Sequence, residues 1–166
     1  LFIQNVIPHN LAQGEHLSTR TELHRVDTIA IFERQVISTL KANMAYGDGK
    51  EYSKINECLC QNLNTLSEAD QRAIKTFIVA SDFLEHATYS FYSYKDNPSD
   101  IITKDYDLLA DGFRQECTLK DLTGIKVIGI YTPTSPDLDE LVKYSVKFFE
   151  KYLTAAGAEF TFRASF

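Results

Sequence analysis

The feature that most constrains the fold is an apolar run that ends in a carboxylate. Residues 76–80 (TFIVA) lead directly into Ser81 and Asp82. Apolar and β-branched residues at successive positions are typical of a strand that is buried on both faces of a parallel sheet. Open α/β sheets bind ligands or ions at the carboxyl ends of such strands. We therefore expect a parallel sheet with a site beside Asp82.

Strand-like runs and helical patterns alternate along the rest of the chain. The predicted strands span residues 1–7, 76–81, 125–131 and 158–163, and the predicted helices span residues 21–44, 53–63, 67–70, 105–116 and 135–157. Ser53 and Ser135 are predicted to cap their helices, and Gly157 to end the last one in the left-handed conformation. Strand, helix and strand in repetition imply crossover connections, so we expect an α/β fold with a mainly parallel sheet.

Size and charge limit the classes of partner. A chain of 166 residues fits one domain. Its formal net charge of −6 and its lack of a Lys/Arg run argue against nucleic-acid binding, which needs clustered basic side chains. No apolar run approaches the roughly 20 residues that a helix needs to cross a bilayer. We therefore expect no nucleic-acid partner and no membrane span.

The start of the chain and its cysteines give two further expectations. The chain opens at Leu1 in what reads as the middle of a strand, so we expect a longer polypeptide from which an upstream part is missing. Cys58, Cys60 and Cys117 are an odd number that cannot pair completely. Cys58 and Cys60 point to different sides of a helix and lack the partners of a metal site, so we expect two small, partly buried helix residues. A reducing, cytoplasmic setting is the simpler interpretation.

Two interpretations of Asp82 remain open. It could bind a divalent cation such as Mg²⁺ or Mn²⁺ together with the hydroxyls of Ser81 and Ser53, because hard cations favour carboxylate and hydroxyl oxygens. The segment 132–135 could add further hydroxyls to such a site. Alternatively, Asp82 could cap the turn at residues 83–86, since Asp is a preferred capping residue.

An enzyme is the alternative to a binding domain. Asp82 and His86 could perform acid–base chemistry in a hydrolase or a phosphotransfer-type enzyme, but no nucleophile in a glycine-flanked elbow accompanies them. The segment 47–50 lacks the residues of a phosphate loop, and no Gly-x-Gly-x-x-Gly follows a strand, so no nucleotide cofactor is expected. The aromatic run at 89–94 either packs over the edge of the sheet or forms a patch that binds a partner.

Several segments resemble von Willebrand factor type A domains, in particular bacterial type-A-like proteins. Residues 76–82 are similar to the fourth strand of the family with its Ser/Thr-Asp ending, and residues 81–86 and 89–92 are similar to the segment that follows that strand. Residues 119–131 are similar to the next strand, and residues 142–157 are similar to the closing helix. The resemblance extends from about Ile29 to the end of the chain. Ser53 stands where the family has a Ser/Thr-Pro-Ile helix start, although the Pro is missing here.

The resemblance implies a three-layer α/β/α sandwich with a mainly parallel, doubly wound, Rossmann-like sheet. It implies one type-A-like domain over residues 1–166 that lacks its first strand and helix. Such domains are usually non-catalytic binding modules, and many hold a divalent cation through an Asp-x-Ser-x-Ser element, a Thr and an Asp after the fourth strand. Asp82 matches that Asp and Ser53 approximates the Thr, whereas Asp-x-Ser-x-Ser is absent from the sequence.

Three functions are therefore expected in order of preference. The first is a non-catalytic interaction domain whose partner is another protein, with a possible Mg²⁺ or Mn²⁺ site at Asp82, Ser81 and Ser53. The second is a hydrolase or phosphotransfer-type enzyme that uses Asp82 and His86. The third is a structural domain that makes its contacts through the aromatic run at 89–94 and the edge strand at 158–163.

Overall fold

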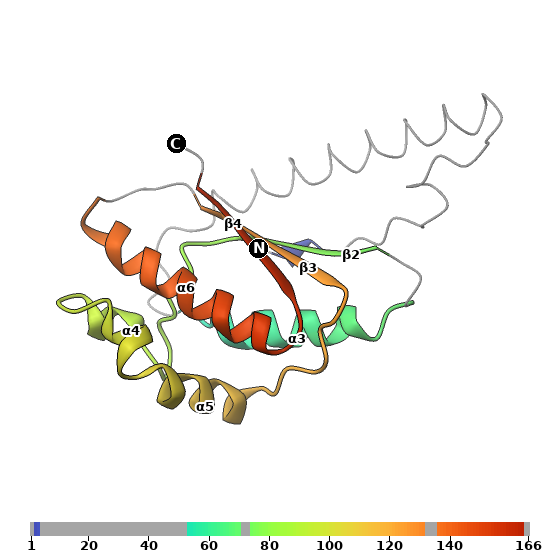
Figure 1. Cartoon of the computed structure of the whole chain (residues 1–166), viewed down its shortest axis with the longest axis horizontal. Helices are drawn as coiled ribbons and strands as arrows, with labels where there is room; N and C mark the ends of the chain where they lie inside the picture. Colours follow the sequence, from blue (N-terminus) through green and yellow to red (C-terminus); the bar gives the residue numbers. More distant parts are fainter. Residues whose placement is uncertain (1, 4–52, 71–73, 132–135, 165–166) are drawn as a thin grey trace.

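The structure is a computed structural model that describes residues 2–3, 53–70, 74–131 and 136–164 (Figure 1). The predicted helix at 21–44, most of the predicted strand at 1–7, and the proposed cap Ser135 lie outside these residues. The described elements are β1 (Phe2–Ile3), α3 (Ile55–Ser67), β2 (Lys75–Ala80), η1 (Phe91–Tyr94), α4 (Asp100–Thr103), α5 (Tyr106–Glu116), β3 (Ile125–Tyr131), η2 (Pro136–Leu138), α6 (Asp139–Ala155) and β4 (Glu159–Ala164). The expected α/β class is confirmed.

The strands form one sheet in the order β1-β2-β3-β4. Strands β2, β3 and β4 are parallel, with Phe77 paired to Val127 and Val127 paired to Phe160. The short strand β1 pairs with β2 in the antiparallel direction. The strand that leads into Asp82 therefore runs beside residues 125–131 and in the same direction, as the sequence predicted.

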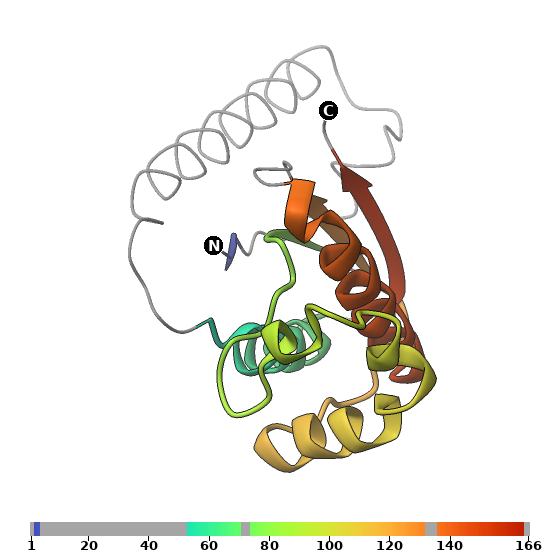
Figure 2. The ribbon, with the colours of Figure 1, turned by 90° about the vertical axis from the view of Figure 1, so that its left-hand side faces the viewer.

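The described helices lie on one side of the sheet (Figures 1 and 2). The chain moves by one strand in the same direction from β2 to β3 and from β3 to β4. Because crossovers between parallel strands are almost always right-handed, two successive steps in one direction place their helices on the same face. The part of the chain that is described thus contains the sheet and one helical layer of the expected three-layer sandwich.

The core lies between this face of the sheet and the helices. Phe77 and Val79 of β2 and Val127 of β3 are buried, and along both strands such buried residues alternate with more exposed ones. Helices α5 and α6 meet them through aromatic rings, of which Phe113 and Phe148 have centroids 5.2 Å apart. The aromatic residues of this core that are fully buried are Phe77, Phe83, Phe91, Phe113, Phe148 and Phe149.

The helix boundaries correct two predictions and confirm a third. Helix α3 begins at Ile55, and Ser53 does not cap it, because its backbone is paired with His86 instead. Ser67 ends α3 and does not open a separate turn of helix, since its hydroxyl donates backward to the Asn64 carbonyl at 2.7 Å. At the other end of the chain, the prediction for Gly157 is confirmed, because its φ of 96° is in the left-handed region.

A disulfide joins Cys60 of α3 to Cys117, the residue that follows α5. Cys60 is a buried helix residue, as expected, but its bond to Cys117 was not predicted, whereas Cys58 is free and partly buried. The two bonded residues are 57 positions apart. Closing a loop of that length in the unfolded chain is worth about 4 kcal/mol of stability in the chain-entropy account. The disulfide thus fastens two helices that the sequence places far apart.

Candidate functional site

The segment that follows β2 is held in place by a series of local hydrogen bonds. The Ser81 amide donates to the carbonyl of Ile130 at 3.0 Å, which continues the pairing of β2 with β3. The Asp82 carboxylate accepts the Leu84 amide at 3.0 Å, and the Ser81 hydroxyl accepts the Phe83 amide, also at 3.0 Å. Asp82 therefore stabilises the turn at residues 83–86, which is one of the two roles expected for it.

Phe83 turns the chain sharply after Asp82. Its φ of 59° is in the left-handed region, which is unusual for a residue with a bulky side chain. The ring is fully buried against Phe149 of α6 and against Gly129, where an added Cβ would lie 2.9 Å from the ring atoms. The Phe83 carbonyl also accepts a hydrogen bond from Ser145. Packing and hydrogen bonding together thus offset the backbone strain and fix the position of Asp82.

Glu85, in the same loop, caps the N-terminus of α3 in place of the expected Ser53. Its carboxylate is 2% exposed and accepts the backbone amide of Asn56 at 2.7 Å, in the first turn of the helix. A carboxylate at a helix N-terminus satisfies amides that have no partner within the helix. Burial nevertheless raises the pKa of Glu85 to about 7, although the amides of α3 oppose the shift and the charge of Glu116 adds to it.

The residue after Glu85, His86, pairs with Ser53, which lies just before the start of α3. The amide of Ser53 donates to the His86 carbonyl at 3.0 Å, and the amide of His86 donates to the Ser53 carbonyl at 2.9 Å. The structure therefore brings the backbone of Ser53 beside the loop that carries Asp82. The contact between Ser53 and this loop is made by the two backbones.

The exposed part of this edge carries an imidazole, a hydroxyl and a phenol. Nδ1 of His86 lies 2.8 Å from the Ser90 hydroxyl, and the His86 ring meets the Tyr92 ring edge-on at 5.1 Å between centroids. Tyr92 is 39% exposed. Partial burial raises the pKa of Tyr92, and the charge of Asp82 raises it further. The aromatic run is therefore divided, because Phe91 is buried in the core while Tyr92 faces outward.

These residues supply few ligands for a divalent cation. Burial raises the pKa of Asp82, which disfavours the ionised form that a cation needs. Among the described residues, no three His, Cys, Asp or Glu side chains gather as a metal-binding group. A site here would have to combine the single carboxylate of Asp82 with the hydroxyls of Ser81 and Ser53 and with water. Mg²⁺ sites with one or two carboxylates and several waters are known, but they usually include substrate phosphates.

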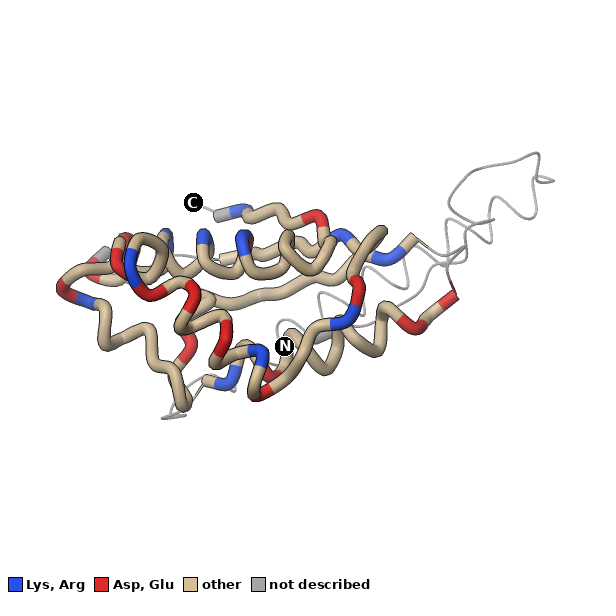
Figure 3. The backbone as a smooth tube through the Cα atoms, turned by 60° about the horizontal axis from the view of Figure 1, so that its bottom comes forward, with Lys and Arg blue, Asp and Glu red and all other residues tan. Residues whose placement is uncertain are grey.

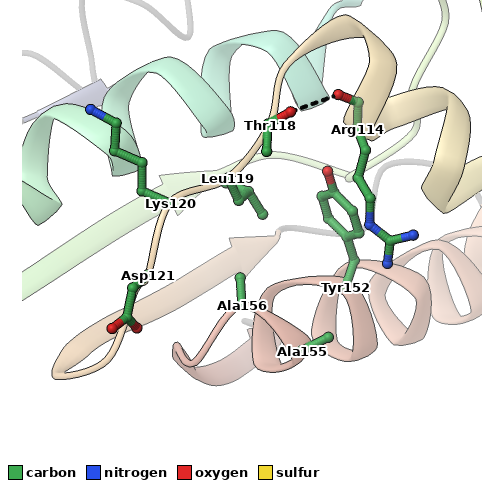
Figure 4. Close-up of a pocket in the computed structure, with 8 residues that line it drawn as sticks. All are labelled: Arg114, Thr118, Leu119, Lys120, Asp121, Tyr152, Ala155 and Ala156. Atoms are coloured by element: carbon green, nitrogen blue, oxygen red, sulfur yellow. Dashed lines mark hydrogen bonds between the residues drawn. The ribbon is translucent and has the colours of Figure 1, made fainter.

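A cavity that the sequence did not reveal lies at the opposite end of the sheet, where β3 begins (Figure 4). Its volume is 360 Å³, and its walls are formed by Arg114, Thr118, Leu119, Lys120, Asp121, Tyr152, Ala155 and Ala156. Within the described part of the chain, the buried hydroxyl of Tyr152 has no hydrogen-bond partner. Burial raises the pKa of Tyr152 to about 12, so the phenol stays neutral. No spacing pattern links the residues around this cavity, because they come from α5, the loop before β3 and α6.

Comparisons with known proteins do not assign the site. No protein family model matches the chain, and no curated protein and no solved structure matches it. None of the helices described here is long and apolar enough to cross a membrane. The resemblance to type A domains and the roles of Asp82, Ser81 and Ser53 as ligands therefore remain predictions.

Proposed function

We propose that this chain is a non-catalytic protein-interaction domain that binds its partner at the carboxyl end of β2. The observation that carries the proposal is that hydrogen bonds to three other elements hold the loop at 81–86 in place. This loop is joined to β3 through Ser81, to α3 through Glu85, and to α6 through the Phe83 carbonyl. A surface that is rigid before binding loses less conformational entropy when a partner docks on it.

The side chains at this edge suit a protein partner. Tyr92 presents a partly exposed ring, and the His86 ring meets it edge-on from one side. Tyrosine is enriched among the residues that dominate protein–protein binding energy, because it combines apolar area with a polar tip. The resemblance of the Ser81–His86 segment to type A domains favours the same edge.

A divalent cation at Asp82 is a separable part of the proposal. Isothermal titration with Mg²⁺ or Mn²⁺ tests it on the wild-type chain and on Asp82→Asn, which keeps the shape but removes the charge. Heat that is lost in Asp82→Asn would support a cation site formed with Ser81 and Ser53. Absence of heat at millimolar ion would reject the cation while leaving the protein-binding proposal intact.

The binding face is tested by capture of partners on immobilised protein, with the wild type compared with Tyr92→Ala. The matched control is Leu108→Ala, because Leu108 is a large apolar residue of α5 that is 66% exposed and belongs to another surface. A partner retained by the wild type and by Leu108→Ala, but lost from Tyr92→Ala, supports the proposal. Equal retention by all three proteins contradicts it.

A hydrolase or phosphotransfer-type enzyme is the second candidate, and one contact favours it. The Ser90 hydroxyl lies 2.8 Å from Nδ1 of His86, which is the reach needed for an imidazole to activate a nucleophile. The same contact also closes a local turn, since the residues are only four positions apart. Hydrolysis of activated esters or phosphate esters that disappears in both Ser90→Ala and Asp82→Asn would favour the enzyme. No turnover by the wild type would reject it.

The cytoplasmic location expected from the cysteine count remains a prediction. The Cys60–Cys117 disulfide argues for an oxidising compartment, because thiols are kept reduced in the cytosol of most organisms. Free-thiol counting on protein isolated under alkylating conditions tests the point. One reactive thiol per chain indicates that the bond is formed, and three indicate a reducing setting.

A further inference from the structure

Strand β4 forms one edge of the sheet in the described part of the chain. Its sequence from Glu159 to Arg163 reads the same in both directions when residues are classed as charged, aromatic and hydroxyl. Glu159 and Arg163 carry opposite charges at the two ends, Phe160 and Phe162 come next, and Thr161 lies at the centre. Figure 3 shows the acidic and basic positions at opposite ends of this strand.

We propose that this edge is a self-association surface on which β4 pairs with β4 of a second copy, antiparallel and centred on Thr161. In that register Glu159 lies opposite Arg163 of the other copy, and Phe160 lies opposite Phe162. Both matches occur twice, because a two-fold axis passes beside Thr161 and the contact is isologous. Opposite charges and aromatic rings at directly facing positions are the pairs that stabilise antiparallel strands.

The two faces of β4 are suited to this pairing. Glu159, Thr161 and Arg163 are exposed on the face away from the core, and among the described residues neither charged side chain has an ion-pair partner. On the core face, Phe160 and Phe162 are only partly buried, although each ring lies 5.9 Å from that of Phe83. A second copy would cover the remaining surface of both rings and give each charge a partner.

The pairing would also satisfy the edge that β4 presents in the described part of the chain. An edge strand presents a row of amides and carbonyls that can template another chain, and proteins often place charges there to prevent it. A single sign would repel a second copy, whereas the opposite signs at Glu159 and Arg163 attract it in one register. The result would be a continuous sheet through two copies, with β4 next to β4. Because six residues per chain form a small interface, we expect a dissociation constant on the order of micromolar.

Charge reversal tests the register. Sedimentation velocity over a concentration series of the full chain should show a monomer–dimer equilibrium for the wild type. Glu159→Arg and Arg163→Glu should each weaken it by on the order of tenfold or more, because each places two like-charge pairs across the axis. The double variant, and an equimolar mixture of the two single variants, should restore it, because both arrangements recreate opposite charges at the facing positions.

Matched controls and a covalent trap complete the test. Glu150→Arg and Lys147→Glu make the same charge changes on the exposed face of α6 and should leave the equilibrium unchanged. Thr161→Cys, in a Cys58→Ser background, should give disulfide-linked dimers, since facing Cα atoms of antiparallel strands are within disulfide range. A monomer at all concentrations, or single variants that dimerise as the wild type does, would overturn the proposal. If a single variant unfolds, the double variant and the cysteine variant decide.

Discussion

Replacing Glu85 by glutamine should change how the stability of this protein depends on pH. Glutamine has the shape of a protonated glutamate, so it keeps an oxygen that accepts the Asn56 amide but carries no charge. The wild-type carboxyl is almost completely buried, and its pKa is raised to about 7 by that burial. The variant removes the only ionisation at this position while disturbing the packing little.

The direction in which the free energy of unfolding changes with pH follows from the pKa of Glu85 in the folded and unfolded states. In the unfolded chain Glu85 loses its proton near its ordinary pKa of 4.5, and in the folded chain it does so near 7. Between these values the folded state holds a proton that the unfolded state has released, so the free energy of unfolding falls as the pH rises. The values lie about 2.5 pH units apart, each worth about 1.4 kcal/mol, so the loss is at most about 3.5 kcal/mol by pH 8.

Urea unfolding followed by circular dichroism between pH 5 and pH 8.5 measures the effect. At pH 5 Glu85→Gln should be more stable than the wild type by less than about 1 kcal/mol, and at pH 8.5 it should be more stable by up to about 3.5 kcal/mol. Glu150→Gln, on the exposed face of α6, is the matched control and should parallel the wild type. If Glu85→Gln also parallels the wild type, or is less stable at high pH, the carboxyl is not kept protonated by burial.

Three further predictions concern stability. Gly129→Ala should lower the free energy of unfolding by about 1–3 kcal/mol in urea denaturation, because a Cβ would lie 2.9 Å from the Phe83 ring, and an unchanged midpoint would show that the ring moves aside easily. The double variant Cys60→Ser/Cys117→Ser should lose up to about 4 kcal/mol by the same assay, while Cys58→Ser should lose little, and an equal loss from both would show that the bond does not form. Tyr152→Phe should leave the melting temperature unchanged or raise it, because the buried hydroxyl has no partner in the described structure, and a clear decrease would show that it has one.

The strands were predictable from the sequence because their signal is local. The apolar runs at 76–80 and 125–131 have the composition of buried strands, and their adjacency follows from the rule that joins strands through crossover helices. The role of Asp82 in stabilising the turn could likewise be predicted, because Asp side chains accept hydrogen bonds from amides two residues ahead. Both inferences use residues that are near one another in the sequence.

The rest depends on contacts between distant segments. Glu85 caps α3 by accepting the amide of Asn56, which is 29 positions earlier, and neither segment has a sequence pattern that predicts this hydrogen bond. From the sequence, Asp82 and His86 of this loop were considered for acid–base chemistry, whereas Glu85 was given no role. The cavity around Tyr152 is likewise formed by three segments that are far apart in the sequence, and no sequence periodicity predicts it.

The bond between Cys60 and Cys117 makes part of the polypeptide a closed covalent ring. The ring includes β2, the loop with Asp82, and helices α4 and α5, whereas β3, α6 and β4 lie outside it. Within the ring, residues 95–97 form an exposed turn where a protease could reach the backbone. A single cut there would leave the two fragments in one molecule until a reductant released them. Proteolytic damage at this surface would therefore be hidden on a non-reducing gel.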